Sequence, residues 1–132
     1  MVDGSLQNRV CLVTGASRGI GVAIARAAAV AGAAVAVNYR SSQRQAELLV
    51  EELRDLGHQA IAVQADVGSS YDVAKMYTTI ERELGPVSLL VNNAGVSLRE
   101  LVTHTSDEQW ELVMNTNLKG PFLCCRQALP NM

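Results

Sequence analysis

The segment TGASRGIG, residues 14–21, decides the fold of this chain. It follows the apolar run VCLV at residues 10–13 and opens an alanine-rich stretch at residues 22–31. A strand, a glycine turn and a helix in this order deliver a phosphate to a helix N-terminus, where backbone N–H groups are unpaired and the helix dipole favours an anion. Its three glycines have no Cβ, so the turn can be tight and a pyrophosphate can approach closely. The segment therefore predicts a dinucleotide site.

The glycine spacing of this segment is Gly-x-x-x-Gly-x-Gly, which differs from the Gly-x-Gly-x-x-Gly dinucleotide fingerprint. The spacing alone would be weak evidence. Its position between the first expected strand and the first expected helix makes it much stronger. The alternative is a glycine-rich turn that merely lets a strand meet a helix, and we favour the cofactor hypothesis.

Short apolar runs alternate with helical patterns along the rest of the chain. The runs are apolar throughout, as in strands buried on both faces, and lie at residues 10–13, 34–37, 60–63 and 89–91. Between them, apolar residues recur at i, i+3, i+4 and i+7, as in a helix with one apolar stripe. This alternation predicts right-handed βαβ crossovers and an α/β fold, a Rossmann-type parallel sheet with helices on both faces. Because a complete doubly wound domain has about six strands, we expect residues 1–132 to form only the N-terminal part, with about four.

The composition argues against several other classes of protein. The chain has 132 residues and a net charge of −2, which does not favour a nucleic-acid partner. No apolar run approaches the ~20 residues of a membrane span, and no signal peptide is visible, so we expect no membrane partner and a cytoplasmic location. The three cysteines lack metal-ligand spacing, so no metal site is expected. Cys11 lies within the first expected strand and is interpreted as a small buried hydrophobe.

The end of the second expected strand predicts the type of dinucleotide. NAD sites place an Asp or Glu there to bind the ribose 2′-OH, but this strand ends VNYRSS, and no acid occurs until Glu47. Arg40 is placed to meet a 2′-phosphate, and Arg18 could reach it from the glycine loop. Two guanidinium groups suit a dianionic phosphate, so residues 1–132 are expected to form an NADP(H)-binding domain. The alternative is that both arginines are solvated surface residues.

Two further segments follow expected strands. Asp66 could accept a hydrogen bond from the adenine amino group, or it could instead cap the following turn; the sequence leaves both open. The segment NNAG at residues 92–95 could satisfy backbone groups where strands diverge and leave space for a ribose. Its alternative is a simple Asn-Gly-type turn.

These motifs, taken in order with the segment NLKG at residues 117–120, resemble the short-chain dehydrogenase/reductase family. Within that family the chain is most similar to 3-oxoacyl-[acyl-carrier-protein] reductases, and glucose 1-dehydrogenases share its segment VNYRS at residues 37–41. The resemblance implies an NADPH-dependent oxidoreductase that reduces a ketone to an alcohol, in fatty acid synthesis if the closer similarity holds. It implies a small-molecule or acyl-carrier-bound ketone substrate and a parent protein that is a homodimer or homotetramer.

The resemblance also assigns residues. It implies that the cofactor is contacted by Gly15, Ser17, Arg18, Gly19, Ile20, Gly21, Arg40, Ser41, Asp66, Val67, Asn93, Ala94 and Gly95. Asn117 would be the asparagine of the family's catalytic Asn-Ser-Tyr-Lys tetrad. The family's serine and Tyr-x-x-x-Lys pair would lie beyond Met132, so we expect the chain to be inactive alone. The alternative is a non-catalytic, truncated fragment that at most binds a nucleotide or a partner.

Asn117 also has a physical interpretation of its own. It follows a helical pattern that starts near Ser106, and Gly120-Pro121 is expected to interrupt that helix. Proline has no N–H, so Pro121 cannot donate to the carbonyl of Asn117, four residues earlier. In the family this carbonyl holds a water of the proton relay; the alternative is an ordinary helix kink.

Overall fold

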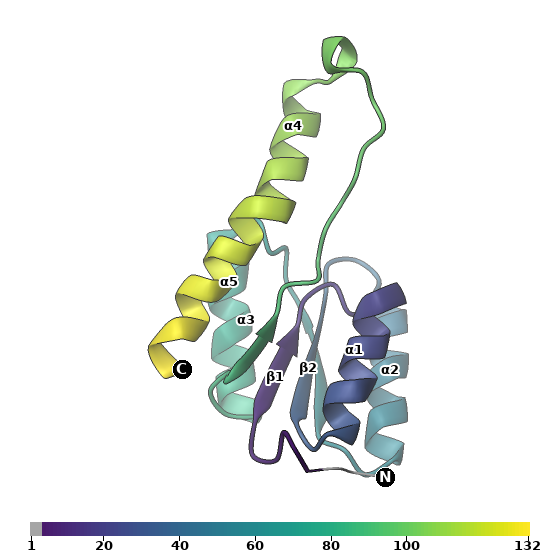
Figure 1. The fold of residues 1–132 in the computed structure, drawn as a ribbon, viewed down its shortest axis with the longest axis vertical. Helices are drawn as coiled ribbons and strands as arrows, with labels where there is room; N and C mark the ends of the chain where they lie inside the picture. The colour runs from purple at the N-terminus through teal and green to yellow at the C-terminus, as the bar shows by residue number, and fades with distance from the viewer. Residues whose placement is uncertain (1–3) are drawn as a thin grey trace.

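The computed structural model describes residues 4–132. Strands and helices alternate as far as β4 (Figure 1). The elements are β1 Val10–Val13, α1 Gly19–Val30, β2 Ala34–Tyr39, α2 Gln43–Asp55, β3 Ala60–Gln64, α3 Ser70–Glu83, β4 Leu89–Val91, α4 Asp107–Met114, the π-helical turn η2 Asn115–Lys119 and α5 Gly120–Ala128, with short 3₁₀ turns η1 Val102–His104 and η3 Leu129–Asn131.

The strands form one parallel sheet in the order β3-β2-β1-β4. The glycine segment follows β1, a central strand, and the chain moves outward to β2 and β3 before it returns to β4 on the other side. This confirms the predicted Rossmann-type fold. It also brings the ends of all four strands to one edge of the sheet.

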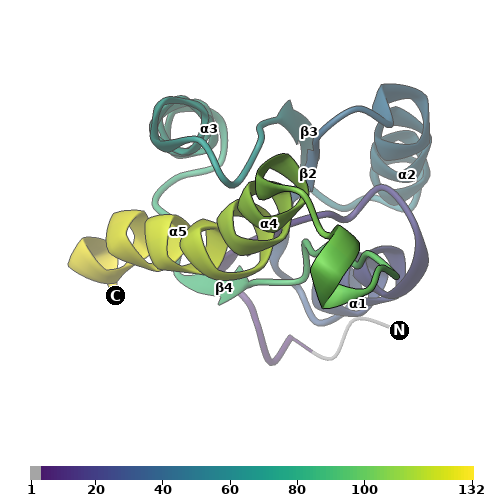
Figure 2. The ribbon, with the colours of Figure 1, turned by 90° about the horizontal axis from the view of Figure 1, so that it is seen from above.

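The two faces of the sheet carry separate cores. Along β1, Cys11 and Val13 pack toward α1 and α2, and Val10 and Leu12 pack toward α3 and α5. Figure 2 shows these two helix pairs on opposite sides of the strands. The run VCLV is apolar throughout because both faces of β1 are buried.

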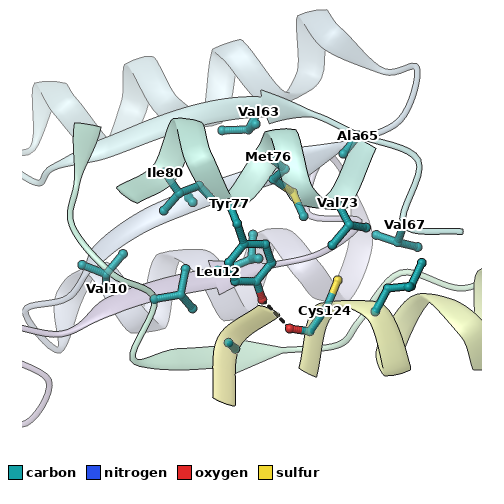
Figure 3. Packing of buried hydrophobic residues seen from close by; sticks show 14 of the residues in the cluster. Val10, Leu12, Val63, Ala65, Val67, Val73, Met76, Tyr77, Ile80 and Cys124 are labelled. Carbon is teal, nitrogen blue, oxygen red and sulfur yellow. Dashed lines mark hydrogen bonds between the residues drawn. The ribbon is translucent and has the colours of Figure 1, made fainter. Parts of the chain in front are cut away.

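The core on the α3 side contains a hydrogen bond as well as apolar contacts (Figure 3). The buried Tyr77 hydroxyl donates to the carbonyl of Cys124 in α5 at 2.8 Å, which joins α5 to α3. Burial raises the pKa of the Cys124 thiol to about 12 and that of Cys11 to about 11. Cys11 is fully buried, as its interpretation as a small hydrophobe requires.

Two helix starts are capped by serine side chains. The Ser69 hydroxyl accepts from the N–H of Asp72 at the start of α3. At the start of α4, Ser106 and Gln109 form a complete capping box. Two strands are longer than predicted, because β2 continues to Tyr39 and β3 to Gln64.

Helix α4 rises away from the sheet at the end of a long connection (Figure 1). None of its residues is buried, and the side chain of Trp110 is 59% exposed. The helix widens into the π turn η2, in which the N–H of Gly120 donates to the carbonyl of Asn115. The interruption therefore precedes Pro121, contrary to the prediction. Pro121 instead occupies the first turn of α5, a position that proline tolerates.

Within residues 4–132, no helix is long and apolar enough to cross a membrane. The same residues contain no cluster of three or more His, Cys, Asp or Glu side chains that could hold a metal ion.

Candidate functional site

A cavity of about 350 Å³ lies at the edge of the sheet where the strands end. Its walls come from the glycine loop, the segments after β2, β3 and β4, and the turn η2. The lining residues are Gly15, Ser17, Arg18, Asn38, Arg40, Ser41, Ser42, Ala65, Asp66, Val67, Asn93, Ala94, Gly95, Val96 and Thr116.

The glycine loop forms part of this wall because its backbone comes very close to neighbouring segments. Gly15 has φ +60°, and a Cβ there would lie 2.8 Å from the Cα of Ala94. A Cβ on Gly21 would lie 2.7 Å from both the carbonyl oxygen of Gly15 and the side-chain nitrogen of Asn93. Only glycine fits these two positions, because any side chain there would clash with the neighbouring segments.

Thr14 and Asn93 join the glycine loop to the segment after β4. The buried Thr14 hydroxyl accepts from the N–H groups of Asn93 and Ala94, both at 3.0 Å. In return, the Asn93 side-chain amide donates to the carbonyls of Thr14 and Gly15, both at 3.0 Å. These bonds fix the strand ends on either side of the cavity. The simple-turn alternative does not account for them.

Charged side chains line the side of the cavity beside β2 and β3. Arg40 follows β2 directly, and its guanidinium lies 3.8 Å from a carboxylate oxygen of Asp66. The other Asp66 oxygen accepts from the N–H of Gly68 at 2.9 Å. Asp66 therefore caps its turn and also lines the cavity, so its two proposed roles are compatible. With Arg18, the lining holds two guanidinium groups and one carboxylate.

The helix α2 begins beside Arg40. Ser42 is its N-cap residue, and its hydroxyl makes no capping hydrogen bond. The first turn of α2 carries no acidic residue, so its N–H groups add positive potential near Ser41 and Ser42. This edge of the cavity favours an anion.

Three residues expected to contact a cofactor do not line the cavity. These are Gly19, Ile20 and Gly21. The side chain of Ile20 is 73% exposed, whereas Gly21 is buried beneath the loop that it supports. The other ten residues expected to bind the cofactor all line it.

The sequence interpretation missed five lining residues, which are Asn38, Ser42, Ala65, Val96 and Thr116. Asn38 had a signal, because it is the polar residue within an otherwise apolar strand end. Ser42 precedes the helical pattern of α2, where a capping serine is typical. Thr116 and Val96 gave no comparable signal, since tertiary packing brings them to the cavity.

Asn117 stands next to the cavity and is held by its side chain. Its amide donates to the carbonyl of Val96 at 2.7 Å and accepts from the N–H of Val96 at 2.8 Å. Val67 packs against Gly120, where a Cβ would come within 2.7 Å of it. The η2 turn is therefore fixed between the segments that follow β3 and β4.

No tyrosine lines the cavity within the described part of the chain. Tyr39 and Tyr77 are buried, and Tyr71 is 75% exposed at the start of α3. Tyr71 and Lys75 have the Tyr-x-x-x-Lys spacing, but neither belongs to the site.

Known proteins resemble this chain in sequence and in fold. The family described as short chain dehydrogenase matches residues 9–132. The 3-oxoacyl-[acyl-carrier-protein] reductase of Staphylococcus epidermidis is 42% identical over 125 residues, which cover 95% of this chain and 51% of that protein. The chain thus spans about half the length of the curated relatives it matches.

Solved structures agree with these sequence matches. A blue fluorescent protein from a metagenomic library, in complex with NADPH, is 39% identical with a TM-score of 0.93 and covers 97% of this chain and 53% of its own. A short chain dehydrogenase from Burkholderia cenocepacia, in complex with NADP, is 33% identical with a TM-score of 0.91 and covers 96% and 51%. The fold, the order of the motifs and these matches together show that the chain belongs to the short-chain dehydrogenase family.

Proposed function

We propose that this chain binds NADP(H) and forms the cofactor-binding part of a reductase that converts a ketone to an alcohol. The observation that carries the proposal is Arg40, which follows β2 directly and lines a cavity shared with the glycine loop and Arg18. An NAD site would have a carboxylate at the end of β2, and this strand ends without one. The NADPH and NADP complexes of similar proteins support the same cofactor.

The residues present fit such a cofactor. We assign the pyrophosphate to the glycine loop, and the 2′-phosphate to Arg40 and Ser41 with Arg18 opposite. Asp66 and Val67 would hold the adenine. The segment Asn93–Gly95 would hold the nicotinamide-side ribose, with Gly19, Ile20 and Gly21 shaping the loop from behind. When bound, NADPH supplies a hydride for carbonyl reduction.

The reaction and its setting belong to the same proposal. The similarity to 3-oxoacyl-[acyl-carrier-protein] reductases supports a small-molecule or acyl-carrier-bound ketone as the substrate and a cytoplasmic location. Glucose 1-dehydrogenase-like chemistry is the second candidate, favoured by the segment at residues 37–41. Asn117 is the proposed catalytic residue, and a homodimer or homotetramer is the proposed assembly, with neither a nucleic acid nor a membrane as a partner.

The resemblance implies that a tyrosine protonates the substrate carbonyl, and no tyrosine of the described residues lines the cavity. We therefore propose that the 132-residue chain binds the cofactor without turnover, as a non-catalytic fragment would. NADPH oxidation by the purified chain with a 3-oxoacyl thioester would contradict this.

The cofactor proposal is tested by comparing two arginine variants. R40A removes a guanidinium of the cavity, and R44A removes one from the first turn of α2 that lies outside the lining. In calorimetric titrations R40A should lower the affinity for NADPH about 10- to 100-fold, since a charge-assisted hydrogen bond contributes about 1.5–3 kcal/mol. NADH binding should hardly change in R40A, and R44A should resemble the unmodified chain. Equal affinities of the unmodified chain for NADPH and NADH would contradict the proposal.

A further inference from the structure

Asn38 belongs to the cavity wall and is only 1% exposed. Its side-chain oxygen accepts from the N–H of Gly15 at 3.1 Å, and its backbone oxygen accepts from the N–H of Ala16 at 2.8 Å. Its side-chain nitrogen donates to the carbonyls of Val63 and Ala65, both at 3.2 Å. One residue of β2 therefore holds both the glycine loop and the end of β3.

This bonding pattern requires an amide. The acceptor must face an N–H group on β1's side, and the donor must face two carbonyls on β3's side. An aspartate could keep the bond to Gly15, but its second oxygen would face both carbonyls without a proton. A leucine of similar size would leave Gly15, Val63 and Ala65 without these partners, and unpaired buried polar groups are costly.

We propose that Asn38 is a positioning residue for the nucleotide site, which holds the glycine loop and the Asp66 turn at a fixed separation. It connects the wall assigned to the pyrophosphate with the wall assigned to adenine. Both of these groups occur in NADP and in NAD. Asn38 should therefore support the binding of both nucleotides equally, unlike Arg40, which should act on the 2′-phosphate alone.

This inference rests on the proposed nucleotide binding, and its test separates the two. NADP⁺ and NAD⁺ are titrated calorimetrically against the unmodified chain, N38D, N38L and Y77F. Y77F is the matched control, because it also removes a buried side-chain hydrogen bond to a carbonyl but lies outside the cavity. N38L should lower both affinities at least tenfold and leave their ratio unchanged, whereas Y77F should lower thermal stability and leave affinity within twofold.

The pH dependence of N38D adds a result that simple destabilisation would not give. A protonated carboxyl can donate to one carbonyl while it accepts from Gly15, as the asparagine does. The affinity of N38D for NADP⁺, relative to the unmodified chain at the same pH, should therefore rise as the pH falls from 8.5 to 5.5. A flat ratio, or N38L binding within twofold of the unmodified chain, would overturn the inference.

Amide hydrogen exchange tests, without any nucleotide, whether Asn38 holds the glycine loop in place. In N38L, exchange of the Gly15 amide should accelerate at least tenfold relative to that of Ser88, whose N–H bonds to Val10 at the opposite end of the strands. If the unmodified chain bound neither nucleotide, the proposed function would fail, and this exchange ratio would still test Asn38. An unchanged ratio would show that Asn38 does not organise the loop.

Discussion

The edge of the cavity, where the strands end, and the α4–α5 arm differ in which side chains they bury and which they expose. At the cavity edge, short polar side chains such as Thr14 and Asn38 are buried and bonded to the backbone of neighbouring segments. Along the arm, defined here as residues 107–128, large apolar side chains such as Trp110 and Phe122 are exposed. The cavity edge is therefore specified by tertiary hydrogen bonds, whereas α4 depends on a local capping box and has few partners in the described chain.

This contrast predicts at which residues substitutions should change the stability of the protein most. A buried polar group that loses its partner costs about 1–3 kcal/mol, while a surface substitution usually changes stability by less than about 0.5 kcal/mol. Changes at the cavity edge should therefore affect folding and binding together. Substitutions at the exposed apolar residues of the arm should affect stability and nucleotide binding little.

The largest effect is expected for G21A. Its Cβ would meet the backbone of Gly15 and Ala16 at 2.7 and 2.8 Å, where nothing can move cheaply. We expect a loss of about 4 kcal/mol in the free energy of unfolding, because overpacking a rigid site is costly. Urea denaturation followed by circular dichroism measures this loss. G95A is the matched control, since its Cβ would come no closer than 3.4 Å to Asn117, and equal losses in both variants would refute the steric argument.

T14V should have the next largest effect. Valine keeps the shape of threonine but leaves the N–H groups of Asn93 and Ala94 without their acceptor. We expect the unfolding free energy to fall by about 3 kcal/mol. T14S, which keeps the hydroxyl and removes one buried methyl group, should lose about 1 kcal/mol. If T14S lost as much as T14V in the same denaturation experiment, the hydroxyl would not be the cause.

High pH should weaken the core by a smaller amount. Burial raises the pKa of Cys11 from 9.0 to about 11. The stability that the neutral, buried thiol contributes is therefore complete below pH 9 and is lost as the pH rises through 11. Cys11 alone should lower the unfolding free energy by about 2 kcal/mol by about pH 10.5. C11A should show a shallower decline between pH 9 and 11 in the same denaturation series. A parallel decline in both proteins would exclude this cause.

The smallest effect on stability is expected on the arm. W110K replaces a side chain that is 59% exposed and should change the unfolding free energy by less than about 0.5 kcal/mol. If the exposed face of α4 takes part in the proposed homodimer or homotetramer, W110K should also reduce self-association in sedimentation-velocity experiments. L12A, which empties a fully buried site, should lose several kcal/mol and serves as the contrasting control. A W110K loss that approaches that of L12A would end the distinction between the two regions.

The cavity edge was largely predictable because its signals are local. The bounds of β1 and β4 were predicted as the structure has them from their continuous apolar runs. Such runs are typical of strands buried on both faces, which holds for β1, whereas the residues of β4 are half-buried. Arg40 and Asp66 were placed at the site because they follow strands whose ends share one edge. The extension of β2 to Tyr39 was not predicted, because the polar Asn38 is accepted in the core only through its tertiary bonds.

The arm was less predictable because its features depend on packing. The start of α4 near Ser106 was predicted from a local helical pattern, whereas the position of the π turn was not. Proline indicated an interruption at residue 121, but the widened turn is where Val67 packs on Gly120 and the Asn117 side chain bonds Val96. No pattern along the chain reveals such contacts.

The central claim is that the cavity edge binds NADP(H) and recognises its 2′-phosphate. It is tested most directly by ¹H–¹⁵N correlation spectra of the chain titrated with NADP⁺ and, separately, NAD⁺. The account predicts shifts in the glycine loop, including Arg18, and at Asp66 with both nucleotides, additional shifts at Arg40 and Ser41 with NADP⁺ alone, and none at Trp110. Identical shifts with both nucleotides, or shifts confined to the arm, would contradict it.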